Sequence, residues 1–234
     1  MRILSWNVEK LTAGGVAVAE EIVRHEADLV ALQEFQPGKR GDEFIYRVQQ
    51  DGFGGIHFEQ FEKGFCSAIF SRQLLNPVTK PAGLPPQHWA TYWAEASCGD
   101  FGISCIHVPV SSYPEERRAF REAAVKRCRE RGQFTHVLVG DFNATPEEIV
   151  EPNRKLPADR WFDNLRNMGW RDAWRTCNSG KTEYSCFTRA GSGFRLDQAW
   201  LSPSAANLLL DAKLDHAARL RGLSDHSLLI VDLK

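Results

Sequence analysis

The sequence lacks the features that mark a membrane protein, a disulfide-bonded domain or a polybasic nucleic-acid binder. No apolar run approaches the length needed to span a bilayer. The six cysteines include no C-x-x-C pair and no spacing typical of a zinc site. Lysine and arginine total 29 and aspartate and glutamate total 30, so the formal net charge is only −1. This balance excludes a protein whose affinity for nucleic acid comes mainly from bulk positive charge.

Motifs for a covalent nucleophile are also missing. The chain has no G-x-S-x-G element and no cysteine in a recognisable Cys/His arrangement. Its first residues enter a predicted strand without the apolar core of a signal peptide. We therefore expect a cytoplasmic protein with reduced cysteines, no membrane span and no obligate protein partner.

What the sequence does contain is the pattern of one α/β domain over residues 1–234. Hydrophobic residues make up 43%, which is typical of a globular core. Residues 3–8 and 29–32 read as strands around a helix at 16–27, a β-α-β unit that predicts parallel neighbours. A charged helix is expected at 115–131. Further strands are predicted at 56–60, 66–71, 89–98, 101–107, 137–139, 182–188, 194–201, 208–216 and 228–233.

The predicted strand at 137–139 ends in Gly140-Asp141-Phe142-Asn143. Glycine, aspartate and asparagine are ordinary turn residues, so a simple turn is the first interpretation. In open α/β sheets, however, ligands bind just beyond the carboxyl ends of strands. Other strands of this chain also end in polar side chains, which favours a site.

These polar residues lie at the ends of predicted strands, with Asp197 interrupting one: Asn7, Glu34, His107, Asp141, Asn143, Asp197, Asp225 and His226. Carboxylate and amide oxygens are hard ligands that suit Mg²⁺ or Mn²⁺ better than zinc. Histidines beside carboxylates suit proton transfer near neutral pH. The set therefore points to metal-assisted attack of water on a phosphoester.

Six short motifs occur in order along the chain: Trp6-Asn-Val-Glu9, Leu32-Gln-Glu34, His107-Val-Pro109, Gly140-Asp-Phe-Asn143, Arg195-Leu-Asp197 and Ser224-Asp-His226. Together they resemble the endonuclease/exonuclease/phosphatase superfamily, with its exonuclease-III-like and deoxyribonuclease-like members. The resemblance implies a four-layered α/β/β/α sandwich with two central mixed sheets. It places the site at the top of those sheets.

The resemblance also implies a role for each matching residue. The metal ligands would be Glu34, Asn7, Glu9 and Asp225. Asp141 would orient or deprotonate the attacking water, and Asn143 would hold that water or a phosphate oxygen. His226 would bind the scissile phosphate, oriented by Asp197. His107 would act on the phosphate or on the leaving oxygen.

Several neighbouring residues carry a structural interpretation instead. Trp6 and Phe142 are expected to pack behind the site. Arg117, Arg118 and Arg121 are expected on a solvated helix face, although they could grip phosphate. Two roles are open for Arg195, which either faces the substrate or pairs with a site carboxylate.

The first functional hypothesis is an Mg²⁺- or Mn²⁺-dependent nuclease acting on DNA or RNA. The alternative is a phosphatase or phosphodiesterase for a small or lipid-linked phosphoester, such as an inositol phosphate. A catalytically dead binding module is disfavoured because the polar set is intact. Gln198 stands where apurinic endonucleases usually have an aromatic residue, and Val110 where they commonly have a polar one. Both differences argue against specificity for abasic sites.

Overall fold

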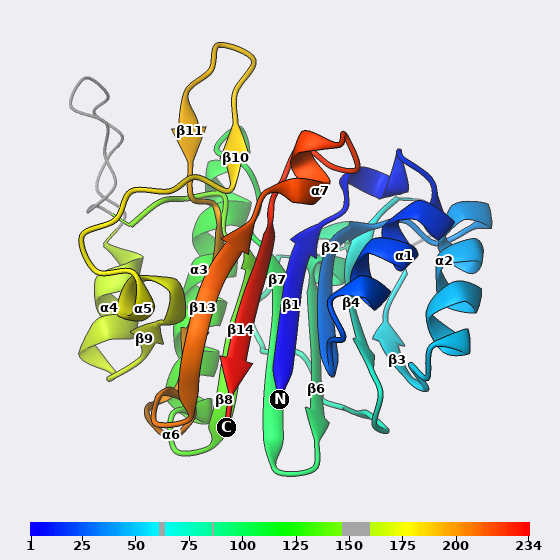
Figure 1. Ribbon diagram of the computed structural model, residues 1–234. Coiled ribbons are helices and arrows are strands. Elements are labelled where there is room, and N and C mark those ends of the chain that lie inside the picture. The colour runs from blue at the N-terminus through cyan, green and yellow to red at the C-terminus, as the bar shows by residue number, and fades with distance from the viewer. Residues whose placement is uncertain (61–63, 86, 147–159) are drawn as a thin grey trace.

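Two six-stranded mixed sheets form the centre of the molecule, described by a computed structural model over residues 1–60, 64–85, 87–146 and 160–234 (Figure 1). The first sheet has the order β13 (Leu209–Asp215), β14 (Leu228–Leu233), β1 (Arg2–Asn7), β2 (Leu29–Phe35), β4 (Cys66–Ser71) and β3 (Gly55–Phe58). The second has the order β5 (Asn76–Pro77), β6 (Trp93–Cys98), β7 (Phe101–His107), β8 (Thr135–Asp141), β12 (Asp197–Leu201) and β9 (Arg171–Asp172). The pairs β1–β2 and β7–β8 are parallel, which confirms the β-α-β unit predicted at the N-terminus.

Helices cover the outer face of each sheet (Figure 1). The helices α1 (Gly15–Arg24) and α2 (Lys39–Gln50) pack on the first sheet through residues such as Ile22 and Phe44. The helices α3 (Pro114–Arg131) and α4 (Trp161–Asn167) pack on the second sheet through residues such as Phe120 and Phe162. The predicted four-layered α/β/β/α sandwich is confirmed.

Shorter elements connect these layers. They are the 3₁₀ helices η1 (Glu9–Leu11) and η2 (Gln87–Tyr92), the helices α5 (Ala173–Cys177), α6 (Pro203–Ala206) and α7 (Ala217–Leu220), and a two-stranded sheet of β10 (Cys186–Phe187) and β11 (Gly193–Phe194). All six cysteines are free. Within the described ranges, no helix is long and apolar enough to cross a membrane. The predicted irregular segment 144–159 lies mostly outside the described residues.

The alternation of side chains along the strands positions the site. On β8, Val137 and Val139 point into the core between the two sheets, while Leu138 faces the helices. The next position on the inner face is Asp141, where the strand ends. The same two-residue period that builds the core thus brings polar side chains of several strands to one end of the sandwich: Asn7 on β1, His107 on β7 and Asp197 on β12.

The predicted strand at 89–98 is wrong in its first part. Residues 87–92 form η2, and β6 begins at Trp93. Side chains at i and i+3 eclipse in a 3₁₀ helix, whereas they point to opposite faces of a strand. The helical turn therefore lets the Trp89 and Tyr92 rings meet, with their centroids 5.2 Å apart.

The predicted strand at 194–201, paired with 182–188, is right only in part: residues 197–201 form β12, but they do not pair with 182–188. Only Gly193–Phe194 pairs with Cys186–Phe187, and β12 lies between β8 and β9. The hydroxyl of Ser185 accepts hydrogen bonds from the backbone N–H groups of Leu196 (3.0 Å) and Asp197 (3.1 Å). This side chain takes the place of a strand partner and ends the ladder. Asp197 consequently begins a strand instead of interrupting one.

Candidate active site

A cavity of about 320 Å³ opens where β1, β2, β7 and β8 end. Six of the predicted site residues line it: Asn7, Glu34, His107, Asp141, Asn143 and His226. These residues are spread over more than two hundred positions of the chain and meet only because their strands end together. Asp197 lies directly behind His226 and completes the cluster.

Asp141 is the centre of the cluster. In the strand register it stands opposite both His107 and Asp197. Its Oδ2 accepts a hydrogen bond from Nδ2 of Asn7 (3.1 Å) and lies 3.6 Å from Nε2 of His107 and 4.0 Å from Nε2 of His226. Its Oδ1 accepts the backbone N–H of Asn143 (2.9 Å). One carboxylate therefore contacts or faces four other site residues.

The glycine before Asp141 is required by the fold. Gly140 has φ +146°, and a Cβ at this position would collide with the backbone carbonyl of Ile106. Only glycine adopts this conformation without strain and allows such a close approach to the neighbouring strand. Gly140 thus sets the direction in which Asp141 leaves the sheet.

Asp197 and His226 form a buried ion pair. Nδ1 of His226 donates to Oδ2 of Asp197 over 2.7 Å. Burial alone would lower the pKa of His226, but attraction to Asp197, the hydrogen bond that Nδ1 donates to it, and the nearby Cys186 and Asp141 outweigh burial. Together they raise the pKa of His226 well above its ordinary value. The raised pKa favours the charged imidazole at neutral pH, and its Nε2 lies 4.0 Å from Oδ2 of Asp141. Burial raises the pKa of the Asp197 carboxyl as well, and the charge of His226 opposes that rise.

Glu34 reaches the cavity because β2 is irregular. The register with β4 shifts between Leu32 and Phe35, and Glu34 itself has φ +52°. The extra residue in β2 is a β-bulge. It turns the Glu34 side chain into the cavity, whereas strict alternation along the strand would direct it toward the helices. The Glu34 carboxylate accepts from Nδ2 of Asn7 (3.3 Å) and lies 3.7 Å from Nζ of Lys10.

The donor atoms at this position fit a magnesium-type ion. Among the described residues, no group of three or more His, Cys, Asp or Glu side chains is placed to hold a metal by itself. Mg²⁺ commonly binds through one or two carboxylates and retains several waters, so it does not need such a cage. The carboxylates of Glu34 and Asp141, linked by the Asn7 amide, supply hard oxygens open to the cavity.

Two of the predicted metal ligands do not line the cavity. The backbone N–H of Glu9 donates to Oδ1 of Asn7 (3.0 Å), which fixes that side chain. Asp225 is exposed at the rim, one residue before His226. Their roles as ligands stay predictions. Asn143 does line the cavity, with its Nδ2 donating to the carbonyl of Val108 (2.8 Å).

The structure gives roles to residues for which the sequence predicted none. The hydroxyl of Ser224 donates to the carbonyl of Asn7 (2.6 Å) and accepts the N–H of His226 (3.1 Å), so it ties both strands' site residues together. A wall of aromatic side chains also lines the cavity: Phe65, Trp89, Tyr92 and Tyr113. Their density between positions 65 and 113 is visible in the sequence, but nothing there shows that they face the site.

The arginines have roles other than those expected. Arg195 is fully buried and donates to both carboxylate oxygens of Asp172 (3.3 and 2.6 Å), so it neither faces the substrate nor pairs with a site carboxylate. Arg118 is exposed as predicted, but Arg117 and Arg121 are half-buried. Arg117 donates to the carbonyl of Asn143 (2.7 Å) and thereby braces the end of the site.

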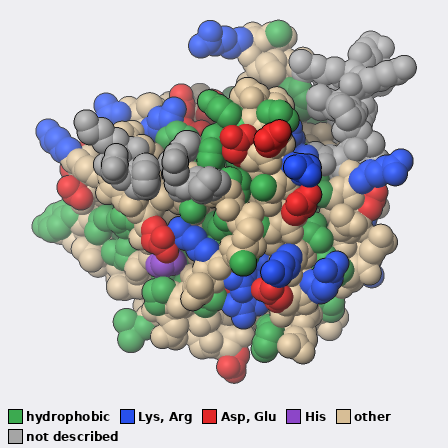
Figure 2. All heavy atoms as spheres, turned by 180° about the vertical axis from the view of Figure 1, so that it is seen from behind, with side chains coloured by type: hydrophobic (Ala, Val, Ile, Leu, Met, Phe, Trp, Pro, Cys, Tyr) green, Lys and Arg blue, Asp and Glu red, His purple; other side chains and the backbone are tan. Residues whose placement is uncertain are grey.

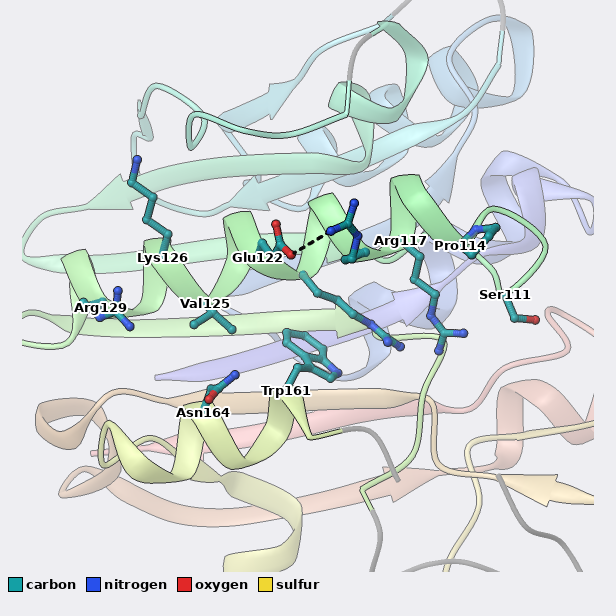
Figure 3. A pocket seen from close by; sticks show the side chains of 11 residues that line it. Ser111, Pro114, Arg117, Glu122, Val125, Lys126, Arg129, Trp161 and Asn164 are labelled. Carbon is teal, nitrogen blue, oxygen red and sulfur yellow. Dashed lines mark ion pairs between the residues drawn. The ribbon is translucent and has the colours of Figure 1, made fainter. Parts of the chain in front are cut away.

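A second pocket, of about 500 Å³, lies between α3 and α4. Figure 3 shows Arg117 from α3 and Trp161 from α4 on its two sides. The guanidinium of Arg121 lies 5.6 Å from the centre of the Trp161 ring. Packing between the two helices, and not solvation, therefore explains why these arginines are half-buried.

This fold and this cluster define a class of hydrolytic phosphoesterases, and comparison with known proteins gives the family. The Endonuclease/Exonuclease/phosphatase family profile matches residues 4–226. The chain belongs to this family, and it is an enzyme of a hydrolytic nuclease and phosphatase type. No curated protein sequence matches the chain significantly.

Solved structures of similar fold span the whole chain. A 3′ phosphatase from Neisseria bound to a product DNA hairpin is 21% identical, with a TM-score of 0.85 over 100% of this chain and 99% of that one. An AP endonuclease from Archaeoglobus fulgidus is 18% identical, with a TM-score of 0.86 over 100% and 99%. A 3′–5′ exonuclease from Neisseria meningitidis is 21% identical, with a TM-score of 0.82 over 100% of both chains. At these identities, the likeness establishes the shared fold.

Proposed function

We propose that the protein is an Mg²⁺- or Mn²⁺-dependent phosphodiester hydrolase that acts on nucleic acid. The observation that carries the proposal is the His226–Asp197 pair directed at Asp141, in one cavity with the Glu34 carboxylate, which Nδ2 of Asn7 holds in place. The structural neighbours include an enzyme bound to DNA and an AP endonuclease, which supports a nucleic-acid substrate.

Each side chain has a task in this mechanism. The metal, held by Glu34 with Asn7, would polarise the phosphate and offset its negative charge. The cationic His226 binds a non-bridging phosphate oxygen, and Asp197 keeps it charged and oriented. Asp141 accepts a hydrogen bond from the attacking water and takes its proton as the water reaches phosphorus. Asn143 and His107 border the same space, where they hold the water and act on the leaving oxygen.

Balanced surface charge favours a second candidate, a phosphatase or phosphodiesterase for a small phosphoester. The formal net charge is −1. On the face seen in Figure 2, basic and acidic side chains are interspersed. A long duplex would gain little from such a surface, whereas a small substrate needs only the cavity.

A metal-dependent activity panel tests the proposal. Plasmid DNA, abasic duplex, single-stranded DNA and RNA, and inositol phosphates are incubated with Mg²⁺, with Mn²⁺ and with excess EDTA. We expect cleavage of nucleic acid with either metal and none in EDTA. Full activity in EDTA would refute the metal mechanism.

Salt separates the two candidate substrates. Affinity for a nucleic acid falls steeply with salt, because each phosphate contact releases counterions, while affinity for a small phosphoester changes much less.

Glu34→Gln is the variant that tests the metal site, and we expect it to need a higher Mg²⁺ concentration for half-maximal rate. Glu43→Gln on α2, away from the cavity lining, serves as its control.

A further inference from the structure

The active-site cavity has an aromatic half that the proposed chemistry does not use. Its catalytic side carries the polar cluster, and its other side is formed by Phe65, Trp89, Tyr92, Val110 and Tyr113. The two sides belong to one continuous space of about 320 Å³. This volume lies at the lower end of the range for small-molecule sites, so it suits one small unit of a substrate and not a base pair.

The aromatic rings of this wall support one another. Trp89 meets Tyr92 edge to face at 5.2 Å and Tyr113 edge to face at 4.8 Å, measured between ring centroids. Phe65 stacks with Tyr92 at 5.1 Å. Trp89 and Tyr92 are each only 9% exposed, while Tyr113 is 45% exposed at the mouth. The buried rings of Trp89 and Tyr92 are therefore held in place by packing, while the Tyr113 ring is accessible from solvent. A preformed stacking surface needs both properties.

His107 joins the aromatic wall to the catalytic cluster. Its ring lies nearly parallel to that of Tyr92, with centroids 5.0 Å apart and an interplanar angle of 11°. Its Nε2 lies 3.6 Å from Oδ2 of Asp141. A single imidazole thus separates the wall from the central carboxylate. A group bonded to a phosphate at the cluster is therefore within reach of these rings.

We propose that the aromatic wall binds the base of the nucleotide that carries the scissile phosphate. The inference rests on the proposed nucleic-acid hydrolase and deepens it: the substrate must present an unpaired, unstacked nucleotide, as a single strand or a frayed end does. Aromatic side chains hold bases of any sequence by stacking, because every base has a π-face. Removing a base from a duplex costs energy, and this cost is least for an already single-stranded base.

The charge of the wall argues against a polyphosphorylated ring as its occupant. Among the described residues that line the cavity there is no lysine or arginine. Lys10 stands beside it, with Nζ 5.2 Å from the centre of the Phe65 ring and 3.7 Å from the Glu34 carboxylate, and this one cation cannot pair with several phosphates. An inositol polyphosphate carries several phosphates that would need cationic partners, since an unpaired buried charge is strongly unfavourable. A nucleobase is planar and uncharged, so it meets both the shape and the polarity of the wall.

Binding of two phosphate monoesters tests the proposal without any cleavage step. Thymidine 5′-monophosphate and 2-deoxyribose 5-phosphate share the phosphate and the sugar and differ in the base. Dissociation constants are measured by titration calorimetry in Mg²⁺. We expect the nucleotide to bind about tenfold or more tightly than the sugar phosphate, in line with the effect of one stacked base. Equal affinities, or no binding of the nucleotide, would overturn the proposal.

Variants of the wall locate the effect. Tyr113→Leu removes the exposed ring and is compatible with folding, because nearly half of this side chain is in solvent. Trp89→Leu removes a buried ring and is the second variant. A fall in the nucleotide-to-sugar affinity ratio in either one supports the proposal, and an unchanged ratio in both overturns it. Tyr113→Phe keeps the ring and should keep the ratio, and Tyr46→Leu on α2, 66% exposed, is the matched control.

Cleavage assays separate this inference from the function on which it rests. The substrates are single-stranded oligonucleotides with a natural or an abasic nucleotide beside the scissile phosphate. Cleavage that does not depend on the base overturns the wall's role and leaves the nuclease intact. Selective binding of thymidine 5′-monophosphate without cleavage of any nucleic acid refutes the nuclease and leaves the wall as a nucleotide site.

Discussion

Two buried histidines of this protein are held in opposite charge states. His136, near the start of β8, is 3% exposed, and His226, beside the end of β8, is 6% exposed. The pKa of His136 is lowered to about 3, so its ring is neutral. The pKa of His226 is raised well above its ordinary value, so its ring is charged. Equal burial in one sandwich therefore does not decide the charge of a histidine.

The neighbours of each ring explain the difference. Burial lowers the pKa of His136, and the positive charges of Arg131 and Arg127 lower it further. Its Nε2 pairs only with the neutral hydroxyl of Ser104, at 2.9 Å. His226 is buried to a similar degree but bonds to the Asp197 carboxylate, with Asp141 close by. One end of the sandwich thus holds a neutral imidazole among structural groups, and the other holds an imidazole whose pKa is raised, in the candidate active site.

Removing the Asp141 carboxylate should have the largest effect, a loss of kcat that a substitution at His136 does not produce. We expect Asp141→Asn to lower kcat by about 10²–10³ or more, because the amide cannot accept the water's proton and loses electrostatic stabilisation of the reaction. Steady-state kinetics on the best substrate of the activity panel measure this. His136→Gln at the opposite end should leave kcat within about twofold, since its ring contacts only structural groups. Equal losses in both variants would show that the two ends are not functionally distinct.

Removing the carboxylate partner of His226 should lower the pKa of this histidine, so that its ring becomes neutral like that of His136. In Asp197→Asn the main source of the raised pKa is lost, so the pKa of His226 falls. We expect kcat/KM near neutral pH to drop about a hundredfold. The alkaline limb of the pH–rate profile should move to lower pH, with partial recovery on acidification. A lower rate with an unmoved alkaline limb would mean that Asp197 only supports the fold.

The smallest effect concerns stability. The unfolded chain binds a proton at His136 below its ordinary pKa of 6.5, whereas the folded chain does not until about pH 3. The unfolded state therefore binds more protons in this window, and stability falls as pH falls through it. His136→Gln should remove about 1 kcal/mol per pH unit from the pH dependence of the unfolding free energy between pH 6.5 and pH 5, because the unfolded histidine is half protonated at pH 6.5 and almost fully protonated at pH 5. Urea unfolding at several pH values measures the slope, and a slope equal to that of the wild type would contradict the prediction.

The sequence predicts the positions of some site residues better than others. Asn7, His107 and Asp141 were predicted at strand ends, and alternation carries each of them into the space between the sheets. Glu34 reaches the cavity only through a shift in register with β4. A shift of this kind depends on the partner strand, so no local pattern predicts it.

The aromatic residues show the corresponding limit for the fold. Apolar rings at Trp89 and Tyr92 read equally well as the start of a strand, and only their contact with each other and with Tyr113 favours a 3₁₀ turn. The break before Asp197 likewise depends on a hydroxyl twelve residues earlier, that of Ser185. Interactions between distant residues overrode local preference at both places.

The sequence by itself determined the α/β class of the domain and the chemical type of the candidate site, while the four layers were implied by the family resemblance. Strand and helix periods are local, and the polar residues that follow each strand are visible without any contact information. The tertiary structure decided which histidine has a raised pKa, which arginines are buried and which rings line the cavity. Those properties depend on the charges and side chains that the fold brings within a few ångströms, and these come from distant parts of the chain.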